Sequence, residues 1–436
     1  MRLNTLILGL CTASALAFAA HAETITIATV NNGDMIRMQK LTDDFTAKNP
    51  DIQLEWVTLE ENVLRERVTT DIATKGGQYD VMTIGTYEVP IWAKQDWLLP
   101  LDNLGADYDT ADIIPAIAGG LSVDGKLYAA PFYGESSFIM YRKDLFEKSG
   151  LTMPDAPTWD FVAEAARKIK ADNPDVNGIC LRGKAGWGEN MAFLTAMSNS
   201  FGARWFDEEW KPQFDQPEWK NTLQFYVDLM KDAGPQGASS NGFNENLALF
   251  QQGKCGMWID ATVAASFVSD PKDSTVADKV GYALAPDTGL SKRGNWLWAW
   301  SLAVPAGTQK AEAAEKFVSW ATSKDYLNLV ASKEGWANVP PGTRTSLYEN
   351  PEYQKAAPFA KMTLDSINSA DPTHPTVKPV PYVGVQFVAI PEFQGLGTTV
   401  GQLFSAALAG QMSVDDALKQ AQDAATATMT ESGYIQ

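Results

Sequence analysis

The chain has 436 residues, a net charge of −18 at neutral pH and 45% hydrophobic residues. This acidity disfavours nucleic acid and anionic lipid as partners, because both carry charge of the same sign. The length and apolar content suffice for two or three packing units with buried cores. Beyond the first 22 residues the one histidine is His374, which disfavours a histidine-based metal site and a hydrolase triad, and no cofactor is expected.

The amino-terminal residues have the features of a secretory signal peptide. One basic residue precedes an apolar run from Leu6 to Ala20, and a small-x-small sequence ends at Ala22. We predict that residues 1–22 are the signal peptide and that cleavage occurs before Glu23. Leu10 stands where a lipoprotein signal needs a small residue, so no lipid anchor is expected. No later segment has the roughly 18 apolar residues of a membrane span.

Strand-like and helix-like segments alternate along the first part of the chain. Apolar patterns predict strands at 24–30, 52–59 and 79–85, with helices at 34–48 and 62–74 between them. This alternation predicts parallel βαβ units and an α/β fold. Ligand-binding loops are then expected at the carboxyl ends of the strands, at residues 31–34, 59–62 and 85–90.

A second region begins near Pro131. A helix is predicted at 158–170, with Thr158 as its N-cap, because acidic residues come early in it and basic residues late. The pattern then predicts a strand at 178–183, a helix at 218–234, strands at 253–260 and within 294–305, and a helix at 310–326. No long flexible linker separates the two regions, so we expect them to touch along an interface.

Three tryptophans stand two residues apart in GNWLWAWSLAVP, residues 294–305. Two is the strand repeat, so Trp296, Trp298 and Trp300 are expected on one face. An apolar stripe usually packs in a core, but Trp is rarely fully buried and its N–H needs a partner. From the strand alone, core packing and a ligand-binding wall both stay open.

Two cysteines, Cys180 and Cys255, follow the predicted signal peptide. An oxidising compartment would allow them to pair. Both also lie in apolar strand-like runs, where a buried free thiol is ordinary. The sequence leaves both possibilities open.

Five sequence motifs occur along the chain in this order: KLYAAPFYGESSFIMYRKDLFEKSGL, PTWDFVAEAARKI, FNENLALFQQGKCGMWID, GYALAPDTG and GNWLWAWSLAVPAGTQKAEAAEKFVSWATS. In order and spacing they resemble those of a known family. The chain is similar to the extracellular solute-binding proteins of bacterial ABC sugar importers, and most similar to the members that serve sorbitol and mannitol uptake. The resemblance implies a periplasmic, monomeric protein that binds a neutral polyol or sugar and delivers it to membrane permease subunits.

The resemblance also implies a two-lobe periplasmic-binding-protein fold with a hinge and a central ligand cleft. On this chain the N-terminal lobe would comprise residues 23–132 plus 300–338, and the C-terminal lobe residues 133–299 plus 339–436. The tryptophan strand would run into the hinge and present its side chains to the cleft. Trp296 or Trp298 is therefore expected to touch ligand, whereas Trp300 is assigned to packing.

A polyol carries many hydroxyl groups on a C–H surface, so its site needs carboxylates and amides as acceptors, Arg or Asn as donors, and aromatic faces. Each candidate also has a structural interpretation: a helix cap, a solvated loop acid, a pair with another residue of the protein or core packing. The nominated ligand-binding residues are Asn32, Glu60 and Glu88, then Tyr133 and Glu135 at the crossing, Arg182, Trp187, Trp258 and Asp260 in the second lobe, Trp296, Trp298, and Arg344, which the family places near the cleft.

Two other functions stay open. A secreted carbohydrate-active hydrolase would need two carboxylates about 5 Å or about 6.5–9.5 Å apart, one of them with a raised pKa. No spacing in the sequence singles out such a pair, so an enzyme is not expected. A binding protein that feeds a chemoreceptor or sensor cannot be separated from an importer component by sequence.

Overall fold

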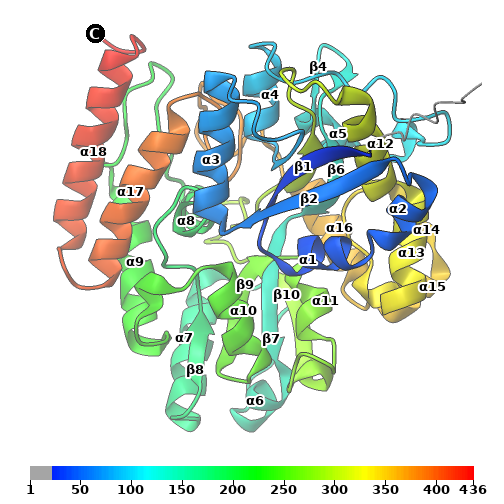
Figure 1. Ribbon diagram of the computed structural model, residues 1–436. Helices are drawn as coiled ribbons and strands as arrows, with labels where there is room; N and C mark the ends of the chain where they lie inside the picture. Colours follow the sequence, from blue (N-terminus) through cyan, green and yellow to red (C-terminus); the bar gives the residue numbers. More distant parts are fainter. Residues whose placement is uncertain (1–21) are drawn as a thin grey trace, which may run out of the picture.

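The computed structural model describes residues 22–436, which form an α/β protein around two sheets (Figure 1). The first sheet has the order β2-β1-β3-β11-β6 and the second the order β10-β7-β9-β8, with a separate β4–β5 ribbon. The strands are β1 Glu23–Val30, β2 Ile52–Leu59, β3 Val81–Ile84, β4 Ser122–Val123, β5 Lys126–Leu127, β6 Ala130–Glu135, β7 Ser137–Arg142, β8 Asn177–Cys180, β9 Cys255–Ala261, β10 Val280–Leu284 and β11 Trp298–Ala303.

Helices cover both sheets, and we call each sheet with its helices a lobe. The helices are α1 Gly33–Lys40, α2 Asp43–Lys48, α3 Glu61–Thr74, α4 Glu88–Ala93, α5 Pro115–Gly120, α6 Lys143–Lys148, α7 Trp159–Asp172, α8 Asn190–Ser200, α9 Pro217–Ala233, α10 Phe243–Gln251, α11 Ala264–Val268, α12 Ala311–Ala321, α13 Lys324–Glu334, α14 Thr345–Glu349, α15 Pro351–Ala356, α16 Ala360–Ser369, α17 Phe393–Leu408 and α18 Val414–Glu431. Short 3-10 turns are η1 Thr110–Asp112, η2 Ala238–Ser240, η3 Ala277–Lys279 and η4 Trp336–Asn338.

The predicted parallel units are confirmed in the first lobe, where β1 pairs in parallel with both β2 and β3. β11 joins this sheet in the antiparallel direction, between β3 and β6. In the second sheet β9 pairs in parallel with β8 and antiparallel with β7. Since β1 and β2 run in parallel, their carboxyl ends reach the same edge of the first sheet, toward the second lobe (Figure 1).

The chain changes sheet between β6 and β7, with a single residue, Ser136, between the strands. It returns between β10 and β11, and β11 pairs with the first sheet from Trp298 onward. Pro341 and Thr343 still hydrogen-bond to the first lobe, through the amides of Gly134 and Ile114. The first sheet thus extends beyond the predicted boundary at 132/133 and resumes before the one at 299/300, and the segment after 338/339 still hydrogen-bonds to the first lobe. The division of the chain into lobes by residue range stays a prediction.

The carboxyl-terminal helices belong to the second lobe. α17 and α18, orange and red in Figure 1, stand side by side and pack against α8 and α9. None of the helices in the described part of the chain is long and apolar enough to cross a membrane. The predicted signal peptide lies outside the described residues, apart from its last position.

Two predicted helices are each divided. The segment 34–48 forms α1 and α2, and the segment 310–326 is split between α12 and α13, where the Ser323 hydroxyl accepts from the Tyr326 amide at 3.0 Å and starts α13. Apolar spacing continues across both breaks, so periodicity did not reveal them. The predicted cap at Thr158 is confirmed, since its hydroxyl accepts from the Phe161 amide at 3.2 Å.

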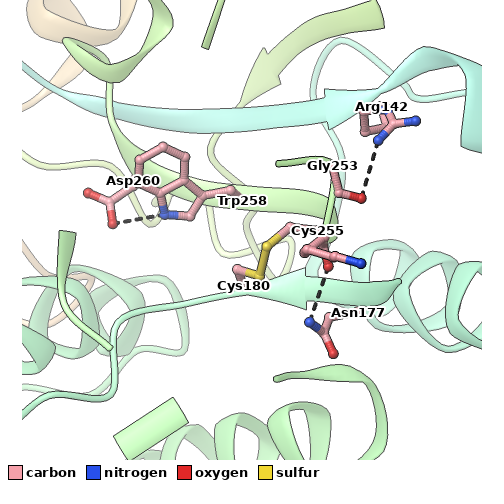
Figure 2. Close-up of a disulfide and its surroundings, with 8 residues drawn as sticks. Arg142, Asn177, Cys180, Gly253, Cys255, Trp258 and Asp260 are labelled. Atoms are coloured by element: carbon pink, nitrogen blue, oxygen red, sulfur yellow. Dashed lines mark hydrogen bonds between the residues drawn. A yellow bond between two sulfur atoms is a disulfide. The ribbon is translucent and has the colours of Figure 1, made fainter. Parts of the chain in front are cut away.

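Cys180 and Cys255 form a disulfide, which decides between the two possibilities left by the sequence (Figure 2). Their Cα atoms are 5.9 Å apart. The bond ties the end of β8 to the start of β9. Both strands continue to site residues, because Arg182 follows β8 and Asp260 lies near the end of β9.

Candidate functional site

A cavity lies between the two lobes. The volume of this cavity is about 50 Å³. This is several times the ~10–15 Å³ that one water molecule needs. Its walls come from the ends of β1, β2 and β6 in the first lobe, from the ends of β8 and β9 in the second lobe, and from β11. The lining residues are Val30, Asn31, Asn32, Glu60, Glu61, Tyr133, Glu135, Arg182, Lys184, Glu189, Phe243, Asn244, Glu245, Ala261, Val263 and Trp300.

A second, smaller chamber, with a volume of about 30 Å³, adjoins this cavity. Four residues, Glu61, Glu135, Arg182 and Trp300, border both spaces. The other lining residues are Arg65, Trp187, Gly188, Ala192, Trp296, Trp298 and Gln386. We call the two spaces together the site.

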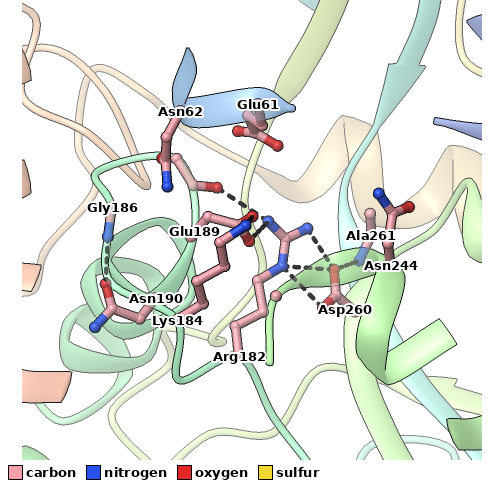
Figure 3. Close-up of polar contacts among 12 residues, drawn as sticks. Glu61, Asn62, Arg182, Lys184, Gly186, Glu189, Asn190, Asn244, Asp260 and Ala261 are labelled. Carbon is pink, nitrogen blue, oxygen red and sulfur yellow. Dashed lines mark hydrogen bonds and ion pairs between the residues drawn. The ribbon is translucent and has the colours of Figure 1, made fainter. Parts of the chain in front are cut away.

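The lobes touch each other around the site. Lys184 donates to the Glu60 carboxylate at 2.5 Å, and the Asn244 side chain donates to the Asn31 carbonyl at 3.0 Å. The Asn62 side chain donates to the Ala185 carbonyl at 3.1 Å. Figure 3 shows Asn62, Lys184 and Asn244 around the same space. These contacts cross from one lobe to the other, so the structure is a closed form.

Arg182 is buried and is held by the carboxylate of Asp260, to which its Nε and Nη2 donate at 2.6–3.1 Å (Figure 3). Its Nη1 donates to the Gly188 carbonyl at 3.0 Å. Burial acts to lower the pKa of Arg182, but the adjacent Asp260 carboxylate outweighs this and raises it. The guanidinium is therefore a fixed cation at the boundary between the chambers.

Asp260 and Trp258 lie behind Arg182 and line neither chamber. Both are fully buried, and the Trp258 indole N–H donates to Asp260 at 3.1 Å. The Ala261 amide also donates to Asp260, at 2.7 Å. The acid is turned toward the arginine and the indole toward the acid, so neither side chain borders the site in this arrangement. Their contact with ligand stays a prediction.

Glu135 and Glu189 are buried carboxyls in the walls of the site. Burial is the main cause that raises the pKa of each to about 8, and the neighbouring carboxylate of Glu61 adds to it. Arg182 opposes the shift in both. Near neutral pH such carboxyls are largely protonated, so they can donate as well as accept hydrogen bonds.

Asn32 and Glu60 line the cavity and also cap helices. The Asn32 carbonyl oxygen accepts from the Met35 amide at 3.0 Å, while its amide group donates to the Tyr133 hydroxyl at 2.8 Å. Glu60 accepts from the amide of Asn62 at 3.1 Å at the start of α3. The structural and the ligand-binding interpretations of these residues are therefore compatible.

The tryptophan strand both packs and lines the site. Trp296 and Trp298 border the second chamber, as does Trp187. Trp300, which the sequence assigned to packing, is buried in the core and also borders both chambers. The indole N–H groups of Trp187 and Trp298 are buried without a hydrogen-bond partner in the described part of the chain.

Arg65 of α3 lies among these indoles. Its guanidinium carbon is 3.9 Å from the ring centre of Trp187, 4.9 Å from that of Trp298 and 4.6 Å from that of Trp300. This geometry is that of cation–π contacts, which are stronger when the groups are buried. Because Trp187 belongs to the second lobe, Arg65 also joins the two lobes.

Glu88 and Arg344 lie outside the site. Glu88 accepts from Arg65 at 2.8 Å and from the Gly85 amide at 2.9 Å, so it supports Arg65 from behind. Arg344 is buried in the first lobe and donates to the carbonyls of Tyr108, Asp109 and Thr322. Arg344 borders neither chamber, since backbone carbonyls of the first lobe take up its donors, and its contact with ligand stays a prediction.

Several lining residues were not nominated from the sequence. Glu61 lies in the predicted loop 59–62 and begins α3, and Asn244 lies at the start of α10, so their positions at helix starts could have suggested them. Glu189 and Lys184 carry no local signal, because only the packing of the loop after β8 brings them to the cavity. The lining residues missed are Val30, Asn31, Glu61, Arg65, Lys184, Gly188, Glu189, Ala192, Phe243, Asn244, Glu245, Ala261, Val263, Trp300 and Gln386.

Comparison with known proteins identifies the family. The family model described as bacterial extracellular solute-binding protein matches residues 32–327. The chain is 57% identical over 416 residues to the mannitol-binding protein of Pseudomonas aeruginosa, with 95% of each chain covered. It is 78% identical to an ABC transporter solute-binding protein from Agrobacterium vitis S4, solved with bound D-mannitol, at a TM-score of 0.94 over 95% of this chain and 100% of that one.

A more distant structure shows how widely the fold is shared. The solute-binding protein from Agrobacterium radiobacter K84, solved in complex with ribitol, is 24% identical, with a TM-score of 0.82 over 94% of this chain and 99% of the other. The two-lobe architecture implied by the resemblance is confirmed. The chain belongs to the bacterial extracellular solute-binding proteins and is a homologue of the mannitol-binding members that serve ABC transporters.

Proposed function

We propose that this protein captures a neutral hexitol of the mannitol type between its lobes and delivers it to the permease subunits of an ABC importer. One observation carries the proposal: the chain is 78% identical to a solute-binding protein solved with D-mannitol and has the same fold over nearly its whole length. The 57% identity to a mannitol-binding protein supports it independently.

The chemistry of the site supports a polyol. Buried hydroxyl groups must each find a partner, because an unpaired one loses its hydration without compensation. Glu135 and Glu189 can pair with hydroxyls as acceptors and, when protonated, as donors. Tyr133 and Asn32 add polar groups on the first-lobe side, and Trp300 offers an aromatic face to C–H groups. Arg182 keeps N–H groups beyond those bonded to Asp260 and Gly188.

The size of the site also supports a small ligand. The two chambers have volumes of about 50 and 30 Å³, less than 100 Å³ together. Cross-lobe contacts such as that of Lys184 with Glu60 close the rim. A single six-carbon chain suits such an enclosed space better than an oligosaccharide.

A ligand panel tests the proposal. Titration calorimetry on the chain from residue 23 onward would compare D-mannitol, D-sorbitol, ribitol, hexoses and disaccharides. We expect saturation by D-mannitol with Kd near 1 µM, roughly −8 kcal/mol. Intrinsic fluorescence should respond as well, because closure changes the surroundings of the cleft tryptophans. Saturation by disaccharides with no response to hexitols would reject the proposal.

The proposal includes a periplasmic location and a monomeric state. Mass spectrometry of the protein from a periplasmic fraction should find Glu23 as the first residue, and light scattering should find a monomer. A retained amino-terminal segment, or a lipid on Cys11, would contradict the location.

The alternative functions have their own test. The relatives that carry the comparison are named as binding and transport proteins. Incubation with oligosaccharides and hexitols should leave every compound unchanged, whereas any new product would favour the hydrolase. Loss of hexitol uptake on deletion of the gene would separate an importer component from a protein that serves a sensor alone.

A further inference from the structure

More carboxyl groups than cations lie around the site. In the described part of the chain three cations line it, and each is hydrogen-bonded to a carboxylate. Arg65 donates to Glu61 and Glu88 at 2.8 Å, Arg182 donates to Asp260 at 2.6 Å, and Lys184 donates to Glu60 at 2.5 Å. Every cation that lines the site is therefore already paired with a carboxylate of the protein.

Two buried carboxyls are left over. Glu135 has no ion pair to a cation within residues 22–436. Glu189 is 3.5 Å from Arg182 and 3.7 Å from Lys184, and both cations make shorter contacts with other acids. The site therefore holds more carboxyl groups than cations.

One carboxyl oxygen of Glu189 is available to a ligand. Only 4% of the Glu189 residue is exposed, and its Oε2 is buried. This oxygen has no hydrogen-bond partner in the described residues. A buried oxygen without a partner is costly, so it needs a donor from outside the protein. Gly242 leaves room for this carboxylate, because a Cβ there would be 2.6 Å from both Glu189 oxygens.

We propose that the site selects ligands by charge: it takes neutral polyols and cationic amino polyols, rejects the corresponding sugar acids, and uses Glu189 as the acceptor that sets this preference. The proposal rests on the proposed function, since it concerns which polyols the same site holds. Glu189 is largely protonated near neutral pH in the free site, and an ammonium group on the ligand favours its ionised form. The ammonium group then donates a charge-assisted hydrogen bond to the Glu189 carboxylate, which is stronger than a bond between neutral groups.

A ligand carboxylate meets the opposite situation. It would enter a buried space beside Glu135 and Glu189 with every lining cation already paired, so its charge would be neither solvated nor matched. Burial already raises the pKa of both carboxyls to about 8, which is the sign of a space that disfavours further negative charge. The sugar acid is therefore excluded although its size differs little from that of the hexitol.

The test uses three ligands of one configuration: D-mannitol, 1-amino-1-deoxy-D-mannitol and D-mannonate. Calorimetry at pH 7 on the wild-type chain from residue 23 should give an amino-mannitol Kd equal to or below that of mannitol. D-mannonate should bind at least about tenfold more weakly. Equal binding of mannonate and mannitol, or a marked loss for the amine, would overturn the proposal without any variant.

Two variants assign the effect to one side chain. Glu189→Gln keeps an acceptor oxygen and cannot ionise beside a ligand ammonium group, so the ratio of amino-mannitol to mannitol affinity should fall about tenfold while mannitol still binds. Glu66→Gln removes the same charge from the exposed face of α3 and should leave the ratio unchanged. An unchanged ratio in Glu189→Gln would overturn the role of Glu189. Absence of mannitol binding to folded wild-type protein would overturn the proposed function as well, which distinguishes the two failures.

Discussion

β9 and β11 carry similar sequence patterns and have different roles. Trp258 and Asp260 alternate on β9, and Trp298 and Trp300 alternate on β11. On β9 both side chains are fully buried and bond to each other behind Arg182. On β11 both indoles border the site. Alternation therefore identifies the shared face of a strand and leaves open what covers it.

The residues that cover the two strands come from different parts of the chain. Phe243 and Phe250 of α10 pack on Trp258, with ring centres 5.6 and 6.2 Å away. Trp298 meets Trp187 and Phe387, at 6.0 and 6.1 Å, and these leave a small chamber beside it. The helix α10, which directly precedes β9 in the chain, covers the β9 face, whereas loops from the second lobe cover the β11 face incompletely.

Asp260→Asn is expected to have the largest effect on stability. A small effect would contradict the comparison between β9 and β11. The substitution leaves the buried guanidinium of Arg182 without its counter-charge, so we expect a loss of about 3–5 kcal/mol in the free energy of unfolding. Asp365→Asn, in an exposed pair with Lys361, is the control and should change stability by less than about 1 kcal/mol. Thermal melts measure both. A normal melt with weakened hexitol binding would return Asp260 to the ligand-contacting residues.

Removal of the disulfide is expected to be nearly as costly. Cys180 and Cys255 close a loop with a sequence separation of 75 residues. Replacing both by Ala should lower the free energy of unfolding by about 4 kcal/mol, because the unfolded chain regains entropy. Denaturant melts measure the loss. Two reactive thiols in the denatured, unreduced mature chain would show that the bond does not form.

Trp300→Ala sharpens the contrast between the strands. The Trp300 indole borders both chambers, so truncation should mainly lower hexitol affinity, by about 1–3 kcal/mol. Trp258→Ala is the matched change in the core and should mainly lower the melting temperature. Calorimetry and melts on both variants decide the matter. A large melting loss for Trp300→Ala with unchanged affinity would make the two strands alike.

The smallest expected effect is a dependence of stability on pH. Glu135, which pairs with Trp298 in the register of β6 and β11, and Glu189 have folded-state pKa values raised to about 8. The folded protein therefore binds more protons than the unfolded chain between about pH 4.5 and 8, and stability should fall as pH rises through this window. The melting temperature should drop by a few degrees from pH 5 to pH 8, and less in Glu189→Gln. A rise over that range would contradict the raised pKa values.

The sequence by itself determined the α/β class, the parallel β1–β2–β3 unit and much of the site. Asn32, Glu60 and Arg182 lie at or beyond strand ends, and Tyr133 and Glu135 lie on the last residues of β6. Strand patterns predict where strands end, and the ends of parallel strands reach the same edge of a sheet. Local pattern and connectivity were therefore sufficient for these residues.

Only the tertiary structure decided the rest. It brought Glu189 and Lys184 to the cavity, turned Asp260 onto Arg182 and placed Arg344 among carbonyls of the first lobe. The contacts that fix these roles join residues that are far apart in the sequence, such as Lys184 with Glu60 across the two lobes. A side chain lines a cavity or packs in a core according to what covers its face, and distant segments of the chain supply that cover.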